Sequence, residues 1–478
     1  MINEKDYIEI PQEIVHSISP VQAWHYRIVP KEIHNGSITL FTNKIDDARR
    51  DELELVLDKK IELILLPDTV INKTLSLYYR KSFVSKNKFI SLNAADDDFI
   101  NKLITDARSL GSSDIHIEAY KDKCRVRLRV DGSLVERYQI SFSDYPSIIN
   151  KIKIAANLDI AEKRLPQDGR IFFKSTLDQF DIRVSALPTL YGEKIVLRIL
   201  SIDASQIDIS QLGFSEKQLE TYLDAVKNPH GIILISGPTG SGKTTTLYAT
   251  LKILNDIKRN ILTIEDPIEY TLPGINQVQL KENIGLTFSS TLRTFLRQDP
   301  DIIMVGEIRD GDTAQMAIRS SLTGHLVLST IHTNSAWGTV TRLIDMGTPS
   351  YLIANTLTLS VAQRLVKLLC PFCKQERKKP ILQTISLYAE VKNKESKPFE
   401  PQGCDKCFHT GYKGRKAIYE VIKVDEHLSK CIKNNELDVK DYLQKNGISS
   451  LAESALHLFT NGETSYEEVY PILQSSSY

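Results

Sequence analysis

The chain has 478 residues, of which 41% are hydrophobic and 25% are charged, and its 60 Lys and Arg residues balance 60 Asp and Glu residues. This length exceeds what one hydrophobic core supports, so we expect several domains, and the zero net charge excludes a bulk attraction to nucleic acid or to an anionic membrane surface. No apolar run approaches the ~20 residues of a membrane span, and residues 1–7 lack a secretory signal, so we expect a cytosolic protein or one peripheral to a membrane from the cytosolic side.

Residues 1–80 mix short alternating runs with helix-like runs, which predicts a small α+β domain without a catalytic signature. The following polar and basic stretch, residues 81–91, predicts a linker. A second domain is expected over residues 92–205. Its run Arg125–Val130 alternates charged and apolar residues, as a half-buried strand does, and ends in an Asp-Gly turn. Taken alone, the arginines of such strands indicate a solvated face.

A complete P-loop follows in the predicted third domain, residues 206–365. The apolar run Ile232–Ile235 predicts a buried strand, and the motif Gly237-x-x-x-x-Gly242-Lys243-Thr244 leads into a helical pattern. Backbone N–H groups of such a loop bind phosphate at a helix N-terminus. Lys243 is expected to reach the β- and γ-phosphates, and Thr244 to bind Mg²⁺. The predicted nucleotide-binding residues are Gly237, Pro238, Thr239, Gly240, Ser241, Gly242, Lys243, Thr244 and Thr245.

Three further apolar runs, residues 261–264, 302–305 and 326–328, alternate with helical patterns and predict a doubly wound parallel sheet. Acidic or polar residues follow each run, at the strand ends where such sheets bind ligands. These are residues 265–269, 306–310 and 329–332. Phosphoryl transfer needs one carboxylate near Mg²⁺ and one at the attacking water, and the spacing alone does not separate these two roles. Taken singly, each of these acids has an alternative role as a helix N-cap or as an ordinary acid of a loop.

Residues 366–420 contain two CxxC pairs, Cys370–Cys373 and Cys404–Cys407, which predict a closed four-cysteine structural zinc site. The long, charged and helix-capable insertion between the pairs extends the usual spacing. A redox dithiol would need one pair only. Residues 421–478 predict short helices and a Ser-rich tail.

The chain resembles the ATPases that power type II secretion and type IV pilus assembly. The motifs that carry the resemblance are the P-loop, an Asp box at residues 263–270, a Walker B region at 296–310, a His box at 323–334, the segments 113–118, 165–171 and 183–198, and the tetracysteine module with residues 410–415. The resemblance implies an α/β and α+β multidomain protein, in which a small variable N-terminal docking domain and a PAS-like domain precede a RecA-like ATPase domain.

By this resemblance Glu269 is the catalytic glutamate, Glu307 is the Walker B acid, and Arg183 and Arg198 are arginine fingers. The His-box histidines correspond to His325 and His332, of which His332 is expected near the nucleotide. The implied cofactors are ATP, Mg²⁺ and Zn²⁺. The implied state is a homohexameric motor at the cytoplasmic face of the inner membrane. Its expected partners are a polytopic platform protein and, through the N-terminal domain, a membrane-associated docking protein, with neither nucleic acid nor direct membrane insertion.

Two other functions share part of this pattern. A RecA-like nucleic-acid translocase has the same P-loop and sheet, although a basic, aromatic strand-binding stretch is not evident in this sequence. A nucleotide-gated scaffold without hydrolysis would tolerate the loss of Glu269 or Glu307. The resemblance to some relatives also raises binding of cyclic di-GMP, but the sequence lacks the Arg-Leu-Gly-x-x-Leu pattern expected for it.

Overall fold

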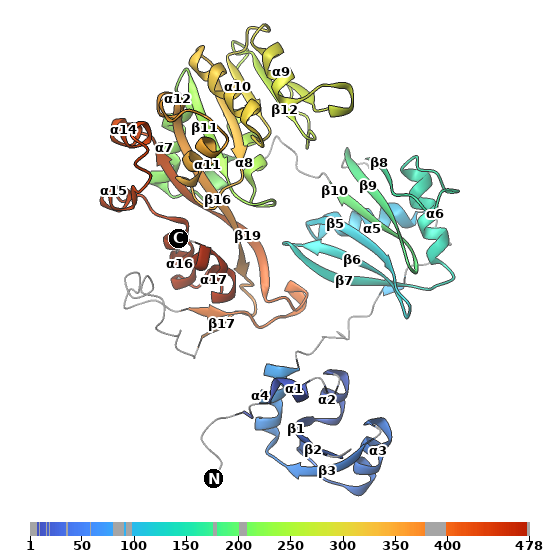
Figure 1. Ribbon diagram of the computed structural model, residues 1–478. Coiled ribbons are helices and arrows are strands. Elements are labelled where there is room, and N and C mark those ends of the chain that lie inside the picture. The colour runs from blue at the N-terminus through green and yellow to red at the C-terminus, as the bar shows by residue number, and fades with distance from the viewer. Residues whose placement is uncertain are drawn as a thin grey trace. The chain divides into compact units, whose positions relative to one another are not determined.

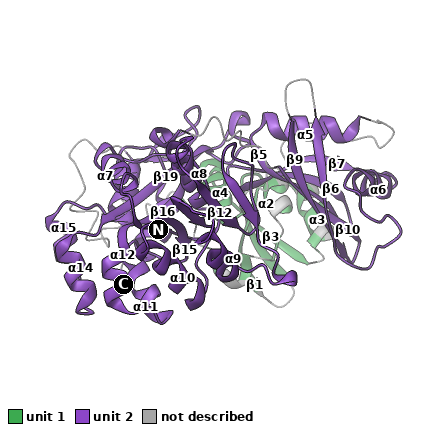
Figure 2. Cartoon of the chain, turned by 90° about the horizontal axis from the view of Figure 1, so that it is seen from above, with its two compact units in different colours: residues 1–89 green, residues 90–478 purple. Residues whose placement is uncertain are grey.

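The computed structural model describes residues 7–8, 10–15, 17–18, 20–34, 37–57, 59–79, 90–91, 98–174, 179–199, 208–377 and 398–475. The chain forms two compact units, residues 1–89 and residues 90–478 (Figures 1 and 2). Of the predicted linker 81–91, only residues 90–91 are described, and most of the insertion between the two CxxC pairs also lies outside the described residues. Within the described ranges, no helix has both the length and the apolar character to cross a membrane.

The first unit is a three-stranded sheet with helices. Strand β2 is antiparallel to β1 and parallel to β3, and α3 connects the two parallel strands. Buried Ile28, Leu40, Leu53 and Ile71 come from both sheet and helices and form its core. Its elements are α1 (Gln12–Val15), α2 (Pro20–Tyr26), β1 (Ile28–His34), β2 (Ser37–Thr42), α3 (Asp47–Leu57), β3 (Lys60–Leu65) and α4 (Asp68–Tyr78).

The second unit begins with a seven-stranded sheet of order β4-β7-β6-β5-β10-β9-β8. Buried residues of α5 and α6 share one apolar core with the strands, so one face of the sheet is covered. Because side chains alternate along a strand, the opposite face carries the charged residues, among them Asp114, Glu118 and Arg198. The elements are β4 (Ile90–Ser91), α5 (Phe99–Ser109), β5 (Ser112–Ala119), β6 (Cys124–Val130), β7 (Ser133–Ile140), α6 (Tyr145–Ala155), β8 (Gln167–Lys174), β9 (Gln179–Thr189) and β10 (Gly192–Ile199).

The larger sheet of this unit has the order β13-β12-β14-β15-β11-β16-β19, and its strands are parallel except for β19. Two apolar clusters, one on each face, show the doubly wound arrangement. The four predicted strands are confirmed. The strands are β11 (Gly231–Ser236), β12 (Ile261–Glu265), β13 (Asn276–Gln279), β14 (Ile302–Val305), β15 (Leu326–Ile331), β16 (Leu357–Leu369) and β19 (Tyr412–Lys423).

Helices cover both faces of this sheet, and a small two-stranded sheet, β17 (Gln375–Glu376) with β18 (Phe399–Glu400), lies beside the cysteine pairs. The helices are α7 (Glu216–Val226), α8 (Lys243–Leu254), α9 (Phe288–Phe295), α10 (Gly311–Leu322), α11 (Gly338–Asp345), α12 (Ser350–Thr356), α14 (Glu426–Lys433), α15 (Lys440–Lys445), α16 (Leu451–Thr460) and α17 (Tyr466–Ser475), with 3-10 turns at Ile209–Gln211, Glu282–Ile284 and Asp405–Cys407.

Strands β16 and β19 cross the domain boundaries placed at 365/366 and 420/421. They pair with each other over most of their length, and β16 also pairs with β11, so the residues on both sides of each boundary belong to one sheet. Burial of Val361, Val366, Ile418 and Ile422 against the core explains why these strands do not end at the expected boundaries. The cysteine module is therefore an extension of the sheet to which β11 belongs.

Candidate active site

The P-loop lies between the end of β11 and the start of α8, as its sequence context predicts. Gly237 and Gly242 have φ values of 148° and 90°, a region that disfavours residues with a Cβ atom. A Cβ atom at Gly237 would also lie 2.5 Å from the carbonyl oxygen of Gln363, and one at Gly242 would lie 2.8 Å from Gln363 Nε2. Gly237 is thus required by the close approach of the β16 backbone, and Gly242 by its positive φ value.

The predicted nucleotide-binding residues form a loop that is largely exposed. Pro238, Thr239, Gly240 and Thr244 are exposed, and Thr245 is half-buried. The buried hydroxyl of Ser241 has no hydrogen-bond partner among the described residues. These exposed groups, together with an unsatisfied donor in the loop, fit a bound nucleoside triphosphate, and the exposed Thr244 hydroxyl fits a Mg²⁺ ligand.

Lys243 turns back onto its own loop. Its Nζ donates to the carbonyl oxygens of Gly237 at 2.8 Å and of Pro238 at 3.1 Å. Burial lowers the pKa of Lys243, while the negative charge of Glu307 acts in the opposite direction. A phosphate group would offer this ammonium an acceptor of opposite charge in place of two neutral carbonyl oxygens, so a bound phosphate can replace them.

Glu307 follows β14 at the carboxyl edge of the sheet. Its Oε1 accepts a hydrogen bond from Arg309 at 2.5 Å, and its Oε2 lies 3.4 Å from His332 Nε2. Burial raises the pKa of Glu307, but the charges of Arg309, His332 and Lys243 outweigh it, and the pKa is lowered overall. Glu307 is therefore a carboxylate at neutral pH, close to the P-loop lysine and to the histidine of the His box.

Glu269 of the Asp box is partly exposed and faces Arg183. Its side chain is 40% exposed, and its Oε2 lies 3.5 Å from Arg183 Nη1. The other guanidinium nitrogen of Arg183 donates to the carbonyl oxygen of Ile268 at 2.6 Å. Arg170, Arg183 and Arg198 line a cavity of about 610 Å³ together with Pro267 and Gln279.

The second predicted arginine finger, Arg198, forms an ion pair on its own sheet. Its Nε donates to Asp114 at 2.9 Å across the β10–β5 pair. Arg183 and Arg198 oppose each other on β9 and β10, but only Arg183 contacts the Asp-box loop in the described structure.

The remaining candidate residues make structural contacts. His325 lies before β15, at the end of the strand opposite to His332, and its Nδ1 lies 2.8 Å from the carbonyl oxygen of Ser320. Asp310 accepts a hydrogen bond from Thr313 N at 2.8 Å and caps α10. This acid therefore has the N-cap role that the sequence analysis gave as the alternative to a role in phosphoryl transfer. Glu265 is 3% exposed, and both of its oxygens accept hydrogen bonds from buried or half-buried neighbours. Glu265 therefore does not face the phosphate site.

Two residues of β16 next to the P-loop were missed by the sequence analysis. Gln363 accepts from Thr246 Oγ1 at 2.9 Å, and Arg364 donates to Asn334 O at 3.0 Å. Burial lowers the pKa of Arg364, and its charge in turn lowers the pKa of Lys243. The signal in the sequence was an adjacent Gln-Arg pair inside a largely apolar run, residues 357–369.

The four cysteines of the CxxC pairs lie together. Their sulfur atoms are 3.9 Å apart for Cys370 and Cys404, and 3.8 Å apart for both Cys373–Cys407 and Cys404–Cys407. Zn–S bonds of about 2.3 Å in a tetrahedron require sulfur atoms about 3.8 Å apart. Since all six cysteines, each in the described part of the chain, are free thiols, the four fit a zinc ion.

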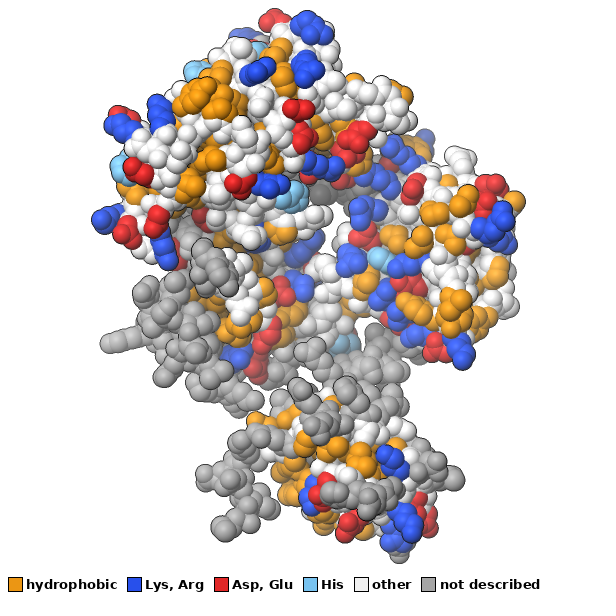
Figure 3. Space-filling view, in the orientation of Figure 1, with side chains coloured by type: hydrophobic (Ala, Val, Ile, Leu, Met, Phe, Trp, Pro, Cys, Tyr) orange, Lys and Arg blue, Asp and Glu red, His pale blue; other side chains and the backbone are white. Residues whose placement is uncertain are grey.

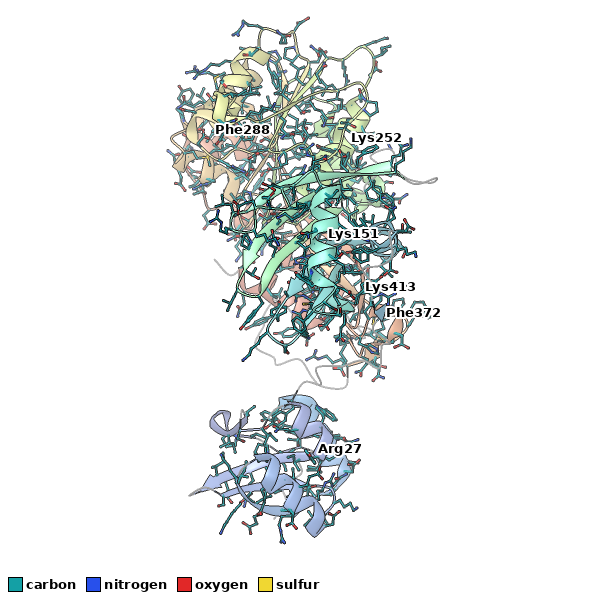
Figure 4. All side chains as sticks on the ribbon, turned by 90° about the vertical axis from the view of Figure 1, so that its right-hand side faces the viewer. Arg27, Lys151, Lys252, Phe288, Phe372 and Lys413 are labelled. Atoms are coloured by element: carbon teal, nitrogen blue, oxygen red, sulfur yellow. The ribbon has the colours of Figure 1, made fainter. Side chains whose placement is uncertain are left out.

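Backbone groups and cations complete the cysteine module. The N–H groups of Cys404 and Gly411 donate to Cys407 Sγ at 3.2 and 3.3 Å, as is common for sulfur ligands of metals. Lys406 Nζ and Lys413 Nζ lie 3.9 Å and 5.5 Å from the ring centroid of the exposed Phe372. Figure 4 shows Phe372 and Lys413 side by side.

Residues 93–471 match the model of the family described as Type II/IV secretion system protein, and residues 4–84 match the MshEN domain, which the sequence analysis did not identify. The chain is similar to the type IV pilus assembly ATPase PilB of Myxococcus xanthus, with 38% identity over 98% of this chain and 88% of the relative. The PilB of Pseudomonas aeruginosa is 48% identical over 78% of this chain and 66% of that protein.

The fold is also similar to that of a solved structure, the ATPase DotB of Legionella pneumophila. The superposition has a TM-score of 0.60 at 21% identity and covers 82% of this chain and 99% of DotB. A likeness at this identity concerns the fold only. The family match and the M. xanthus relative extend over most of the sequence, and the chain belongs to the Type II/IV secretion system protein family.

Proposed function

We propose that this chain is a Mg²⁺-dependent ATPase that works as a homohexameric motor for the assembly of a type IV pilus or a type II secretion pseudopilus. The observation that carries the proposal is the convergence of Lys243, Glu307 and His332 at the carboxyl edge of the sheet, beside a complete P-loop. The names of the relatives support the same activity.

The residues divide the work of phosphoryl transfer. Lys243 and the loop N–H groups hold the phosphates. Thr244 and Glu307 would hold Mg²⁺, which would supply positive charge beside the phosphate oxygens. Glu269 orients and deprotonates the attacking water. Its exposed carboxylate lies on a loop that Arg183 already contacts. Arg183 and Arg198 stabilise negative charge at the γ-phosphate, and His332 senses that phosphate through its contact with Glu307.

The zinc ion has an architectural role, since four thiolates leave no open coordination position. The cytoplasmic face of the inner membrane is the proposed location, reached through a polytopic platform protein and a docking protein that binds residues 1–80. Figure 3 shows basic and acidic side chains intermixed on the visible face, which does not favour a nucleic-acid track.

Steady-state ATP hydrolysis by the purified full chain tests the proposal, with the cytoplasmic domain of the platform protein or single-stranded DNA added. We expect stimulation by the platform domain and no response to DNA. Stimulation by DNA alone would make the chain a translocase, and the absence of turnover in every condition would make it a nucleotide-gated scaffold.

A further inference from the structure

A buried hydrogen-bond network joins the P-loop helix to the Asp-box loop. Tyr248 lies on α8, five residues after Lys243, and is fully buried. Its hydroxyl donates to Glu265 at the end of β12 and accepts a long hydrogen bond, 3.4 Å, from the backbone N–H of Glu269. One hydroxyl group thus contacts both the last residue of β12 and Glu269 in the loop that follows it.

The carboxylate of Glu265 accepts hydrogen bonds from three side chains and holds the network in place. Its Oε1 accepts from Thr263 Oγ1 at 2.7 Å and from Gln277 Nε2 at 3.1 Å, while its Oε2 accepts from Tyr248. A buried carboxylate with several donors is costly to disturb, because removal of one donor leaves a charged acceptor less satisfied. Tyr248 is therefore held by a partner that is itself fixed.

The same network holds the loop at two further points. Gln277 on β13 donates to the carbonyl oxygen of Tyr270 at 3.2 Å and accepts from Leu272 N at 2.7 Å. The rings of Tyr248 and Tyr270 meet edge to face with centroids 4.4 Å apart. Glu269 lies next to Tyr270, and its own side chain is 40% exposed, so these backbone and ring contacts are what orders the loop on this side.

We propose that Tyr248 is a positioning residue for ATP hydrolysis, which fixes Glu269 relative to the P-loop through its hydroxyl group. The proposal rests on the assignment of Glu269 as the catalytic glutamate. Lys243, Thr244 and Tyr248 stand on one rigid helix, so the groups that hold the phosphates and the group that holds the Glu269 backbone move together. The distance between the base and the phosphate is then set by α8, although Glu269 comes from another strand.

The chemistry of the phenol suits this role. Burial, followed by the negative charge of Glu265, raises the pKa of Tyr248, so the phenol keeps its proton at neutral pH and remains a donor to Glu265. The lone pairs of the hydroxyl oxygen remain available to the Glu269 N–H. Phenylalanine would preserve the ring contact with Tyr270 and remove both hydrogen bonds.

The test compares Tyr248→Phe with Tyr222→Phe in the full chain. Tyr222 on α7 is also fully buried and shares a 2.7 Å hydrogen bond with Thr250 of the same helix α8, but neither residue of this bond contacts the Asp-box loop through a hydrogen bond found in the described structure. Each variant loses one buried hydroxyl and keeps its ring, so a general loss of stability appears in both, and thermal unfolding measures it.

We expect Tyr248→Phe to lower kcat for ATP hydrolysis by about 10- to 100-fold, the size of effect produced by a small misplacement of a catalytic group, with the KM and the Kd for ATP unchanged. Tyr222→Phe should keep the wild-type kcat. Equal kcat values for the two variants would overturn the proposal, as would a parallel change of KM and kcat in Tyr248→Phe.

Two further variants separate this proposal from the assignment on which it rests. Gln277→Met removes the hydrogen bonds to Glu265, Tyr270 and Leu272 without touching α8. It should lower kcat in the same way, and so it tests the network even if Tyr248→Phe folds poorly. Glu269→Gln should abolish hydrolysis. If Glu269→Gln is inactive while Tyr248→Phe and Gln277→Met are normal, only the positioning role fails. If Glu269→Gln keeps wild-type turnover, the catalytic assignment fails and the positioning role with it.

Discussion

Arg198 Nε lies 2.9 Å from a carboxylate oxygen of Asp114, and Arg129 Nε lies 3.5 Å from the other oxygen of the same carboxylate. Asp114 and Arg198 are directly opposite on neighbouring antiparallel strands. Such a pair holds the guanidinium on its own sheet, so Arg198 must exchange Asp114 for a phosphate oxygen to act as an arginine finger.

Arg198→Ala should therefore reduce ATP hydrolysis by about 10³-fold, within the range known for arginine fingers, and change ATP affinity far less. Steady-state turnover and binding of a fluorescent ATP analogue measure the two quantities. Arg129→Ala is the matched control, because it removes the weaker partner of Asp114 and should keep hydrolysis near the wild-type rate. Normal turnover of Arg198→Ala would leave this arginine with the ion pair to Asp114 as its only role.

Glu307→Gln should bind ATP and lose nearly all hydrolysis. The amide keeps the size of the side chain but removes the negative charge that faces Lys243, Arg309 and His332. Binding and turnover are again measured separately. Asp310→Asn serves as the control, since asparagine is also a good N-cap for α10 and should preserve activity. Wild-type turnover by Glu307→Gln would remove this residue from the site.

Cys373→Ser should lower the zinc content of the purified chain and destabilise the end of the β16–β19 ribbon. Metal analysis by mass spectrometry and limited proteolysis measure these effects, and a strong chelator should reproduce them in the wild-type protein. Cys431→Ala removes a buried thiol outside the cluster and should leave the metal content unchanged. Wild-type zinc content in Cys373→Ser would contradict the four-thiolate site.

The stability of the chain should also depend on the protonation of Glu420, which is 7% exposed on β19. Burial raises the pKa of Glu420 from 4.5 to about 7, against the opposing effects of the Ala336 and Leu451 N–H groups and of Arg364. Between these two pH values the folded state binds a proton that the unfolded state has lost, so the free energy of unfolding falls as pH rises, by roughly 3 kcal/mol in all.

Melting temperatures at pH 5 and pH 8 test this effect. The decrease from pH 5 to pH 8 should be smaller in Glu420→Gln than in the wild-type protein, because the amide has no proton to lose. Groups other than Glu420 titrate equally in both proteins, so the comparison isolates this residue. Identical decreases would mean that Glu420 ionises in the fold at little cost.

The strands and the P-loop could be predicted from the sequence because their signals are local. A buried parallel strand is a continuous apolar run, and the glycines of the loop occur at fixed spacing, so β11, β12, β14 and β15 lie where the pattern places them. By contrast, β16 contains Gln363 and Arg364 in its middle, and their polar groups are satisfied by Thr246 and Asn334 from distant parts of the chain.

The candidate site divides in the same way. The acids after each strand could be found by position, but their roles depend on contacts that spacing does not encode. Asp310 caps a helix, Glu265 is buried under Tyr248, and Glu307 faces Lys243 and His332. The Asp114–Arg198 pair joins residues 84 positions apart, and only the register of β5 against β10 brings them together.

Strand β16 also links two places with different chemistry. It passes Gly237 and Gly242 of the P-loop at Gln363, and it ends one residue before Cys370. Five residues of strand separate Arg364 from Cys370, so the two lie about 20 Å apart along the chain. Because β19 pairs with most of this segment, any displacement of the phosphate loop would reach the cysteine module along two paired strands. A metal ion held by the four cysteines would tie together the chain segments at the far end of these strands.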